Sequence, residues 1–238
     1  MLPFQFRSES ELAAWRAETF WTKEPETIHW LDEVTAAASG IEVLIDVGAN
    51  VGLYSLYAAS RHSGLQILAV EPVQHNFVEL RNNAEANSFH CIETIRCALS
   101  SSIGQSRIIV EDSRVGSSGA QLHPIGSIGE KIDVQTIDGL IAGYVRTTLR
   151  EQSVAVKIDT DGNEFDILIG ANHALGSKII HSIIVETHPH NRKAISEYLG
   201  AFGMSEDENF LHLVGHSNHR RKSSGRTEET KVFKCTLS

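Results

Sequence analysis

The sequence lacks several features that would have placed it in other protein classes. Its cysteines number three, at positions 91, 97 and 235, an odd count without metal-type spacing, so neither a disulfide framework nor a zinc site is indicated. No apolar run approaches the length of a membrane span. The first residues have neither the basic region nor the apolar region of a secretory signal. We therefore expect a protein of a reducing cytoplasm without a membrane span.

Positive charge is in the minority. The chain has 21 Lys and Arg against 30 Asp and Glu, a net charge of −9, which disfavours a phosphate-tracking surface and excludes nucleic acid as the expected partner. The basic, serine-rich stretch 216–226 is most simply a solvated loop, or else it receives an anionic substrate. The 238 residues, 41% of them hydrophobic, suit one α/β domain with extensions.

The stretch 43–52 is the one around which the chain is organised. An apolar run of strand length breaks into Gly48 and Gly52 with Asn50 between them, and amphipathic spacing follows. This pattern predicts a buried strand that turns sharply into a helix. Glycines let the backbone approach a ligand, and the first turn of a helix offers unpaired N–H groups. The stretch therefore predicts a cofactor cradle.

Acidic residues indicate which cofactor the cradle holds. A dinucleotide fingerprint has three glycines, Gly-x-Gly-x-x-Gly, whereas this turn has two and is preceded by Asp46. A carboxylate there suits a ligand with positive charge, such as S-adenosylmethionine. Glu71 ends a second apolar run before Pro72 and is placed to accept hydrogen bonds from both ribose hydroxyls. The alternative is that Asp46 caps a turn and Glu71 faces solvent.

Strand and helix patterns alternate through much of the chain. Alternation of this kind implies a parallel sheet with helices on both faces. The expected strands are 43–47, 67–71, 92–97, 154–158 and 183–187. An antiparallel pair, 108–110 with 132–134, interrupts the alternation. The insertion between 106 and 134, with a loop at 116–119, is long enough to cover a site, although a surface loop without function has the same pattern. Strands at 210–214 and 232–236 would form a final hairpin.

Residues 1–40 are expected to form an N-terminal helical extension, and 41–238 the cofactor-binding domain. Ser8 with Glu11 has the form of a capping box, and a second helix is expected from Pro25 to a point before Gly40. Such helices cover the mouth of the following domain. Alternatively, the tryptophans form a structural clamp or a dimer contact, which leaves homo-oligomerisation open; they are Trp15, Trp21 and Trp30.

Three carboxylates follow the expected strand 154–158. Asp159, Asp161 and Glu164 lie within six residues, at the sheet edge where doubly wound folds bind ligands. A calcium-binding EF-hand loop is excluded, because Glu164 occupies the sixth position, where that loop needs glycine. The alternative is that Asp161 or Asn163 caps the next helix while Glu164 favours its dipole.

His188 follows the expected strand 183–187. It lies at the same edge as the acidic residues, and its ordinary pKa lies near working pH, so it is a candidate proton acceptor. The alternative is a loop histidine with a structural role.

Taken together, five motifs resemble the FkbM family of S-adenosylmethionine-dependent methyltransferases. They are Asp-Val-Gly-Ala-Asn-Val-Gly at 46–52, Glu-Pro at 71–72, Cys-Ala-Leu-Ser at 97–100, Lys-Ile-Asp through Glu at 157–164, and Val-Glu at 185–186. The resemblance implies a class I, Rossmann-like methyltransferase fold: an α/β sheet of seven mostly parallel strands with the last one antiparallel. It also implies O-methylation of a hydroxyl on a sugar, a glycan or another small-molecule natural product.

The same resemblance implies roles for individual residues. The methionine part of S-adenosylmethionine would lie on Asp46, Gly48, Asn50 and Gly52, the ribose on Glu71 beside Pro72, and the adenine near Ala98. The chain departs from the usual Lys-Ile-Asp-Val-Glu-Gly-Ala-Glu by carrying Asp161 for the glutamate and Asn163 for the alanine. Because the shorter Asp161 replaces the glutamate of the family, the role of that glutamate is not assigned to a residue in this chain.

The chemistry requires a proton acceptor, because an alcohol is a poor nucleophile until its proton leaves. The candidates are His188, Asp159 and Asp161, and Asp159 is also placed to hold the amino group of the donor. We expect no metal. The rival mechanism is a magnesium-like ion held by Asp159, Asp161 and Glu164.

Outside this enzyme class, two functions stay open. One is a catalytically silent adenosyl-binding or scaffold protein. The other is a nicotinamide oxidoreductase, which would need a phosphate-binding turn that the sequence does not show.

Overall fold

The computed structural model describes residues 1–238 apart from 125–127, 147, 152, 208–209, 211–227 and 236–238. The helices are α1 (Glu11–Glu18), α2 (Phe20–Lys23), α3 (Pro25–Val34), α4 (Leu53–Arg61), α5 (Gln74–Ala86), α6 (Ile137–Tyr144), α7 (Glu164–Ile169), α8 (Asn172–Gly176) and α9 (Arg192–Ala201). Among the described residues, no helix is both long and apolar enough to span a membrane.

The strands form two sheets. They are β1 (Val43–Val47), β2 (Gln66–Val70), β3 (Ile92–Ile95), β4 (Ala98–Leu99), β5 (Gly104–Val110), β6 (Ala120–His123), β7 (Glu130–Gln135), β8 (Val154–Ile158), β9 (Ile180–Thr187), β10 (Met204–Glu206) and β11 (Glu229–Cys235). The larger sheet has the order β10-β11-β9-β8-β1-β2-β3, and β11 runs antiparallel to both of its neighbours. This topology confirms the predicted class I methyltransferase fold.

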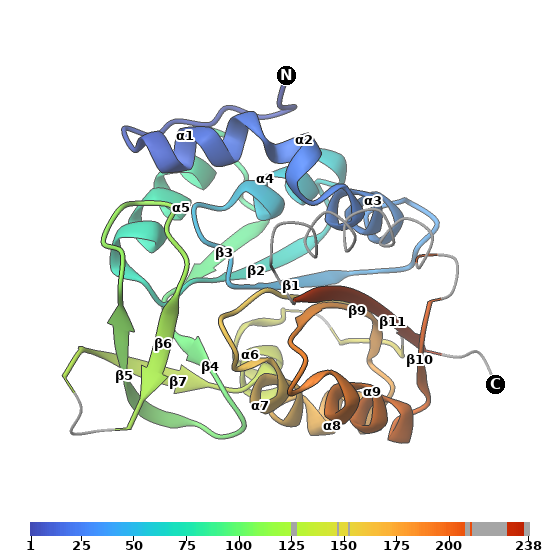
Figure 1. The fold of residues 1–238 in the computed structure, drawn as a ribbon. Helices are drawn as coiled ribbons and strands as arrows, with labels where there is room; N and C mark the ends of the chain where they lie inside the picture. The colour runs from blue at the N-terminus through green and yellow to red at the C-terminus, as the bar shows by residue number, and fades with distance from the viewer. Residues whose placement is uncertain (125–127, 147, 152, 208–209, 211–227, 236–238) are drawn as a thin grey trace.

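The larger sheet is covered on both faces. Every residue of β1 and of β8 is buried, as expected of parallel strands between two layers of helices. Helices α1 to α5 cover one face and α6 to α9 the other (Figure 1). Alternate side chains of β1 pack into two separate apolar cores, one on each face of the sheet. Val43 and Ile45 belong to one apolar cluster and Leu44 belongs to the other.

The N-terminal helices share the core of the domain. Trp30 of α3 is fully buried, and its Nε1 donates a hydrogen bond of 2.9 Å to Ser182 Oγ on β9, so it acts as a structural clamp. The predicted capping box was wrong. Helix α1 begins at Glu11, and its cap is Ser10, whose side chain accepts a hydrogen bond from Ala13 N.

The smaller sheet has the order β4-β7-β5-β6. Strands β5 and β7 pair antiparallel as predicted, whereas β6, on the free side of β5, was not predicted. Residues 111–119 connect β5 to β6, and residues 112–119 are called the strap below. The strap passes near α1 and α5, above the carboxyl ends of β1 and β2 (Figure 1).

The C-terminal hairpin differs from its prediction. Strand β11 covers residues 232–235 of the predicted final strand and begins three residues earlier, but its hairpin partner is β10 (Met204–Glu206). The sequence predicted a strand at 210–214 as that partner. Residues 211–214 lie outside the described residues, as does the basic stretch 216–226.

Candidate active site

Two adjoining cavities lie at the carboxyl ends of β1, β2 and β8. Their volumes are about 510 Å³ and about 310 Å³. They share five lining residues, which are Gly48, Pro72, Ala120, Thr160 and Asp161, and so form one continuous site. This is the switch point of the sheet, where the chain runs outward from β1 in both directions and doubly wound folds bind their ligands.

The glycines of the predicted cradle are required by its geometry. Gly48 has φ +77°, and a Cβ on it would lie 2.0 Å from the carbonyl oxygen of Asp159. Gly52 has φ +91° and precedes α4; its Cβ would lie 2.5 Å from Leu80 Cδ1. A side chain at position 48 would collide with backbone, and one at position 52 would be strained by the positive φ and would displace the end of Leu80. The turn thus brings its backbone at Gly48 against the loop that follows β8.

Glu71 is buried at the end of β2. Its Oε2 accepts a hydrogen bond of 2.8 Å from Asn50 N, and its Oε1 accepts one of 2.9 Å from Val73 N. Burial raises the pKa of the Glu71 carboxyl to about 7, and these backbone hydrogen bonds limit the rise. Glu71 and Pro72, the residues on which the ribose was predicted to lie, both line the larger cavity.

Asp46 lies behind the cavity wall. It is buried, accepts a hydrogen bond of 2.6 Å from Ser55 Oγ, and lies 3.1 Å from Lys157 Nζ. Burial opposes the charge of Lys157, but Asp46, Asp159 and Glu24 outweigh that effect and raise the Lys157 pKa. Asp46 does not line either of the two cavities, so its charge is neutralised inside the protein.

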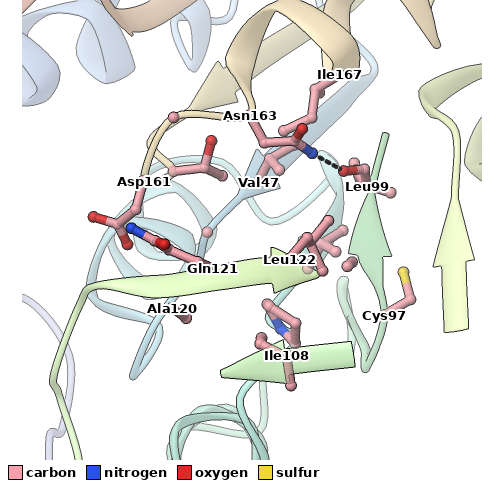
Figure 2. A pocket seen from close by; sticks show the side chains of 16 residues that line it. Val47, Cys97, Leu99, Ile108, Ala120, Gln121, Leu122, Asp161, Asn163 and Ile167 are labelled. Carbon is pink, nitrogen blue, oxygen red and sulfur yellow. Dashed lines mark hydrogen bonds between the residues drawn. The ribbon is translucent and has the colours of Figure 1, made fainter. Parts of the chain in front are cut away.

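Most of the residues that line the smaller cavity are apolar, and Ala98, near which the adenine was predicted, is one of them. Figure 2 shows apolar side chains such as Leu122 and Ile108 on one side, and Asp161 with Asn163 on the other. Asn163 Nδ2 donates a hydrogen bond of 2.6 Å to Leu99 O. Asn163 holds the N-cap position of α7, but its side chain makes no capping hydrogen bond.

The three acids after β8 do not converge. Asp159 and Asp161 line the larger cavity, and Asp161 Oδ2 accepts a hydrogen bond of 2.7 Å from Gly119 N. Glu164 is fully buried, and its carboxylate is occupied by hydrogen bonds from Gly162, Thr160 and Asn191. Among the described residues, no three His, Cys, Asp or Glu side chains are grouped so as to hold a metal ion.

His188 follows β9 and lines the larger cavity. Its Nε2 lies 3.7 Å from Glu164 Oε1, and its Nδ1 lies 4.0 Å from Glu228 Oε1. The ring stacks on His190 with centroids 5.6 Å apart. The structure thus brings the predicted proton acceptor to the same cavity as Asp159 and Asp161.

The strap and α1 complete the cavity wall, which sequence reasoning did not resolve into residues. Asn50 Nδ2 and Asn76 Nδ2 both donate to Ser117 O, at 2.7 and 3.2 Å. Arg16 donates to Gly116 O, and a Cβ on Gly116 would lie 3.0 Å from the backbone of Ala13. The sequence signal was the Gly-Ser-Ser-Gly run at 116–119, whose contacts with α1 are too distant in the chain to predict.

The order of motifs on this site agrees with one protein family. The sequence model of the methyltransferase FkbM domain matches residues 46–225, which run from the cradle through β9. The chain belongs to the FkbM methyltransferase domain family. The match confirms the family suggested by the five motifs.

Relatives of this FkbM domain are distant. The hexuronic acid methyltransferase AglP of Haloferax volcanii is 30% identical over 147 residues, which are 62% of this chain and 56% of that protein. The 31-O-demethyl-FK506 methyltransferase FkbM of Streptomyces tacrolimicus is 32% identical over 103 residues, 43% of this chain and 38% of that protein. The matches thus span about two-fifths to three-fifths of these relatives. The N-terminal domain of human METTL16, solved with SAH, is 13% identical with a TM-score of 0.47, over 89% of this chain and 69% of that one.

Proposed function

We propose that the protein is an S-adenosylmethionine-dependent O-methyltransferase that acts on a hydroxyl of a sugar, glycan or natural product. The observation that carries the proposal is the FkbM match, because most of the residues that line the paired cavities lie in the matched range. The names of two relatives, a hexuronic acid methyltransferase and a 31-O-demethyl-FK506 methyltransferase, support acceptors of these kinds. The acidic balance of the chain favours a small acceptor over nucleic acid.

The two cavities fit the two ends of the donor. The smaller cavity, with apolar side chains such as Ala98 and Leu99 and polar groups such as Asn163, suits a flat adenine ring. Glu71 at the end of β2 suits the ribose hydroxyls, with Pro72 beside it in both cavities. The cradle backbone at Gly48 and the carboxylate of Asp159 suit the methionine part, since the latter can accept hydrogen bonds from an ammonium group.

The buried position of Asp46 changes the role that we assign to it. With Ser55 and Lys157 on its two oxygens, Asp46 supports the cradle from behind. Lys157 also lies 3.7 Å from Asp159 Oδ2. In this proposal Asp46 acts on the donor through Lys157, which orients Asp159.

Catalysis then depends on alignment and on the fate of one proton. S-adenosylmethionine supplies an already activated methyl group, so the protein has to place the acceptor oxygen in line with the C–S bond and exclude water. His188 is placed to take the hydroxyl proton at the wall of the larger cavity. Asp161 is an alternative acceptor, since loss of water around its carboxyl raises its pKa and the hydrogen bond from Gly119 only limits the rise.

The test is methyl transfer from labelled donor to a panel of sugars, glycans and polyketides, with the product bond assigned by mass spectrometry and NMR. We expect a methyl ether and turnover that survives exhaustive chelation. Loss of turnover on chelation, restored by magnesium, would establish the metal mechanism instead. Donor binding without turnover across the panel would favour a silent binding protein.

A further inference from the structure

Glu164 and His188 follow neighbouring parallel strands, β8 and β9, and their side chains meet beside the larger cavity. The Glu164 side chain is fully buried, whereas that of His188 is 19% exposed and lines the cavity. His188 Nε2 lies 3.7 Å from Glu164 Oε1. A buried carboxylate therefore stands directly behind the candidate proton acceptor.

Glu164 is held rigidly in this position. Its Oε1 accepts hydrogen bonds from Gly162 N at 2.8 Å and from Thr160 Oγ1 at 3.0 Å. Its Oε2 accepts one of 2.9 Å from Asn191 Nδ2, and Asn191 Oδ1 accepts one of 2.8 Å from His188 N. Asn191 thus ties the carboxylate and the histidine backbone together, which fixes the ring relative to the charge.

The environment of each ring nitrogen decides where the proton sits. Within the described part of the chain, His188 Nε2 is buried and makes no hydrogen bond, and the Glu164 carboxylate faces it at 3.7 Å. An ionised carboxylate only accepts hydrogen bonds, so a bare Nε2 lone pair would face negative charge, whereas Nε2–H faces its natural acceptor. Nδ1 faces a second carboxylate of the cavity wall, Glu228 Oε1 at 4.0 Å, but the Glu228 side chain is 30% exposed, so water screens its charge more than that of the fully buried Glu164.

We propose that Glu164 is a positioning residue that fixes His188 as the Nε2–H tautomer and leaves Nδ1 to receive the hydroxyl proton of the acceptor. As the acceptor oxygen bonds to the methyl carbon, the C–S bond breaks, its electron pair stays on sulfur, and the proton moves to Nδ1. The resulting imidazolium lies between Glu164 and Glu228, whose charges stabilise it. This inference rests on the proposed function, in which His188 is the base.

The tautomer can be measured without a substrate. Long-range proton–nitrogen correlation spectra of protein labelled with ¹⁵N-histidine, recorded at a pH that keeps the ring neutral, report which nitrogen carries hydrogen. The His188 signals are assigned with a His188→Gln variant. We expect a protonated Nε2 and a bare Nδ1. A protonated Nδ1 with a bare Nε2 would overturn the proposal, whatever the enzyme methylates.

A double-mutant cycle tests the catalytic role of Glu164. Glu164→Gln should lower kcat about ten-fold or more while donor affinity is unchanged, and it should have little further effect in a His188→Ala background. Asp166→Asn, at an exposed position on α7, is the matched control and should leave kcat unchanged. Equal losses of kcat in both backgrounds would show a merely structural role and overturn the proposal.

Two further outcomes are separable. If Glu164→Gln does not fold, Asn191→Ala removes the tie to Oε2 but keeps the carboxylate. Its loss of kcat should also depend on the presence of His188, and independence would overturn the proposal. An absence of donor binding in the wild-type protein would refute the proposed function, while the spectra would still decide the tautomer.

Discussion

At the scale of single residues, the pair of Asp46 and Lys157 shows how a buried charge is made tolerable. The two residues are directly opposite each other on the parallel strands β1 and β8, and both side chains are almost wholly buried. Lys157 also lies over the ring of Tyr54, 5.0 Å from its centroid. Sequence reasoning placed the Asp46 carboxylate on the ligand because the register that brings Lys157 to it joins residues more than 100 positions apart.

Removing one charge of this pair should lower the stability of the protein more than removing both charges. Lys157→Met should lower the free energy of unfolding by about 3–5 kcal/mol, because it leaves Asp46 buried and unpaired. The double variant Asp46→Asn with Lys157→Met should recover part of that loss. Urea unfolding followed by circular dichroism measures both values, and a double variant less stable than Lys157→Met alone would contradict the account.

Glu71 predicts a pH dependence of donor binding. Its pKa is raised to about 7, so the carboxyl gains a proton as the pH falls through 7 and loses the capacity to accept hydrogen bonds from both ribose hydroxyls. Affinity should therefore be highest above pH 7 and fall about ten-fold for each pH unit below the pKa. Calorimetric titrations with S-adenosylhomocysteine at pH 8 and pH 6 test this. In Glu71→Gln the affinity should be lower at pH 8 and nearly independent of pH.

At the scale of elements, the cradle turn, the loop after β8 and the strap are fitted closely to one another. Gly48 N and Ala49 N both donate to Val70 O on β2, at 3.0 Å each. The strap is held from the other side by Asn50 and Asn76. These hydrogen bonds fix the cradle turn against β2 and fix the strap against the turn and α5.

Gly48→Ala should lower stability and donor affinity by more than its backbone strain alone would. Gly40 is the matched control, because it has φ +74°, close to the +77° of Gly48, but open space around its missing Cβ. Gly40→Ala should cost about 1 kcal/mol of stability from positive φ alone. Gly48→Ala should cost more and also weaken donor binding at least about ten-fold, measured by calorimetry. Equal effects of the two substitutions on donor binding would refute the close contact with Asp159.

The strap should be looser when its tie to α5 is cut. Asn76 is buried, accepts a hydrogen bond of 2.7 Å from Gly116 N and donates to Ser117 O. Asn76→Ala should therefore speed amide hydrogen exchange in residues 112–119 and raise the donor dissociation rate, with little change in the central strands. Exchange monitored by mass spectrometry measures the first effect, and unchanged exchange in the strap would show that other contacts suffice.

Elements with strong local signals were predicted well. The strands 43–47 and 154–158 agree with β1 and β8 residue for residue, because long apolar runs bounded by turn residues determine buried strands. Strands β6 and β10 were missed, since each is four residues or fewer, and β10 is defined by its pairing with the distant strand β11. The inward direction of Glu164 was also beyond prediction, because its partner Asn191 comes 27 residues later.

At the scale of the whole molecule, the fold gathers the site from widely separated segments. Parallel strands place Gly48, Glu71, Asp159 and His188 at one edge of the larger sheet, and the strap and α1 close the space above them. Because α1, α3 and the sheet share one apolar core, removal of residues 1–40 should unfold the domain. We expect the circular dichroism spectrum of the truncated chain to be that of an unfolded protein. A native spectrum would show that the domain folds without this part of the core.

The most direct test of the central claim is calorimetric titration of the purified 238-residue chain with S-adenosylmethionine and S-adenosylhomocysteine. The account predicts saturable binding of both compounds at one site, weakened by Gly48→Ala and by Glu71→Gln and retained in Gly40→Ala. Absence of measurable heat with either compound at millimolar concentration, for a chain shown to be folded, would contradict it.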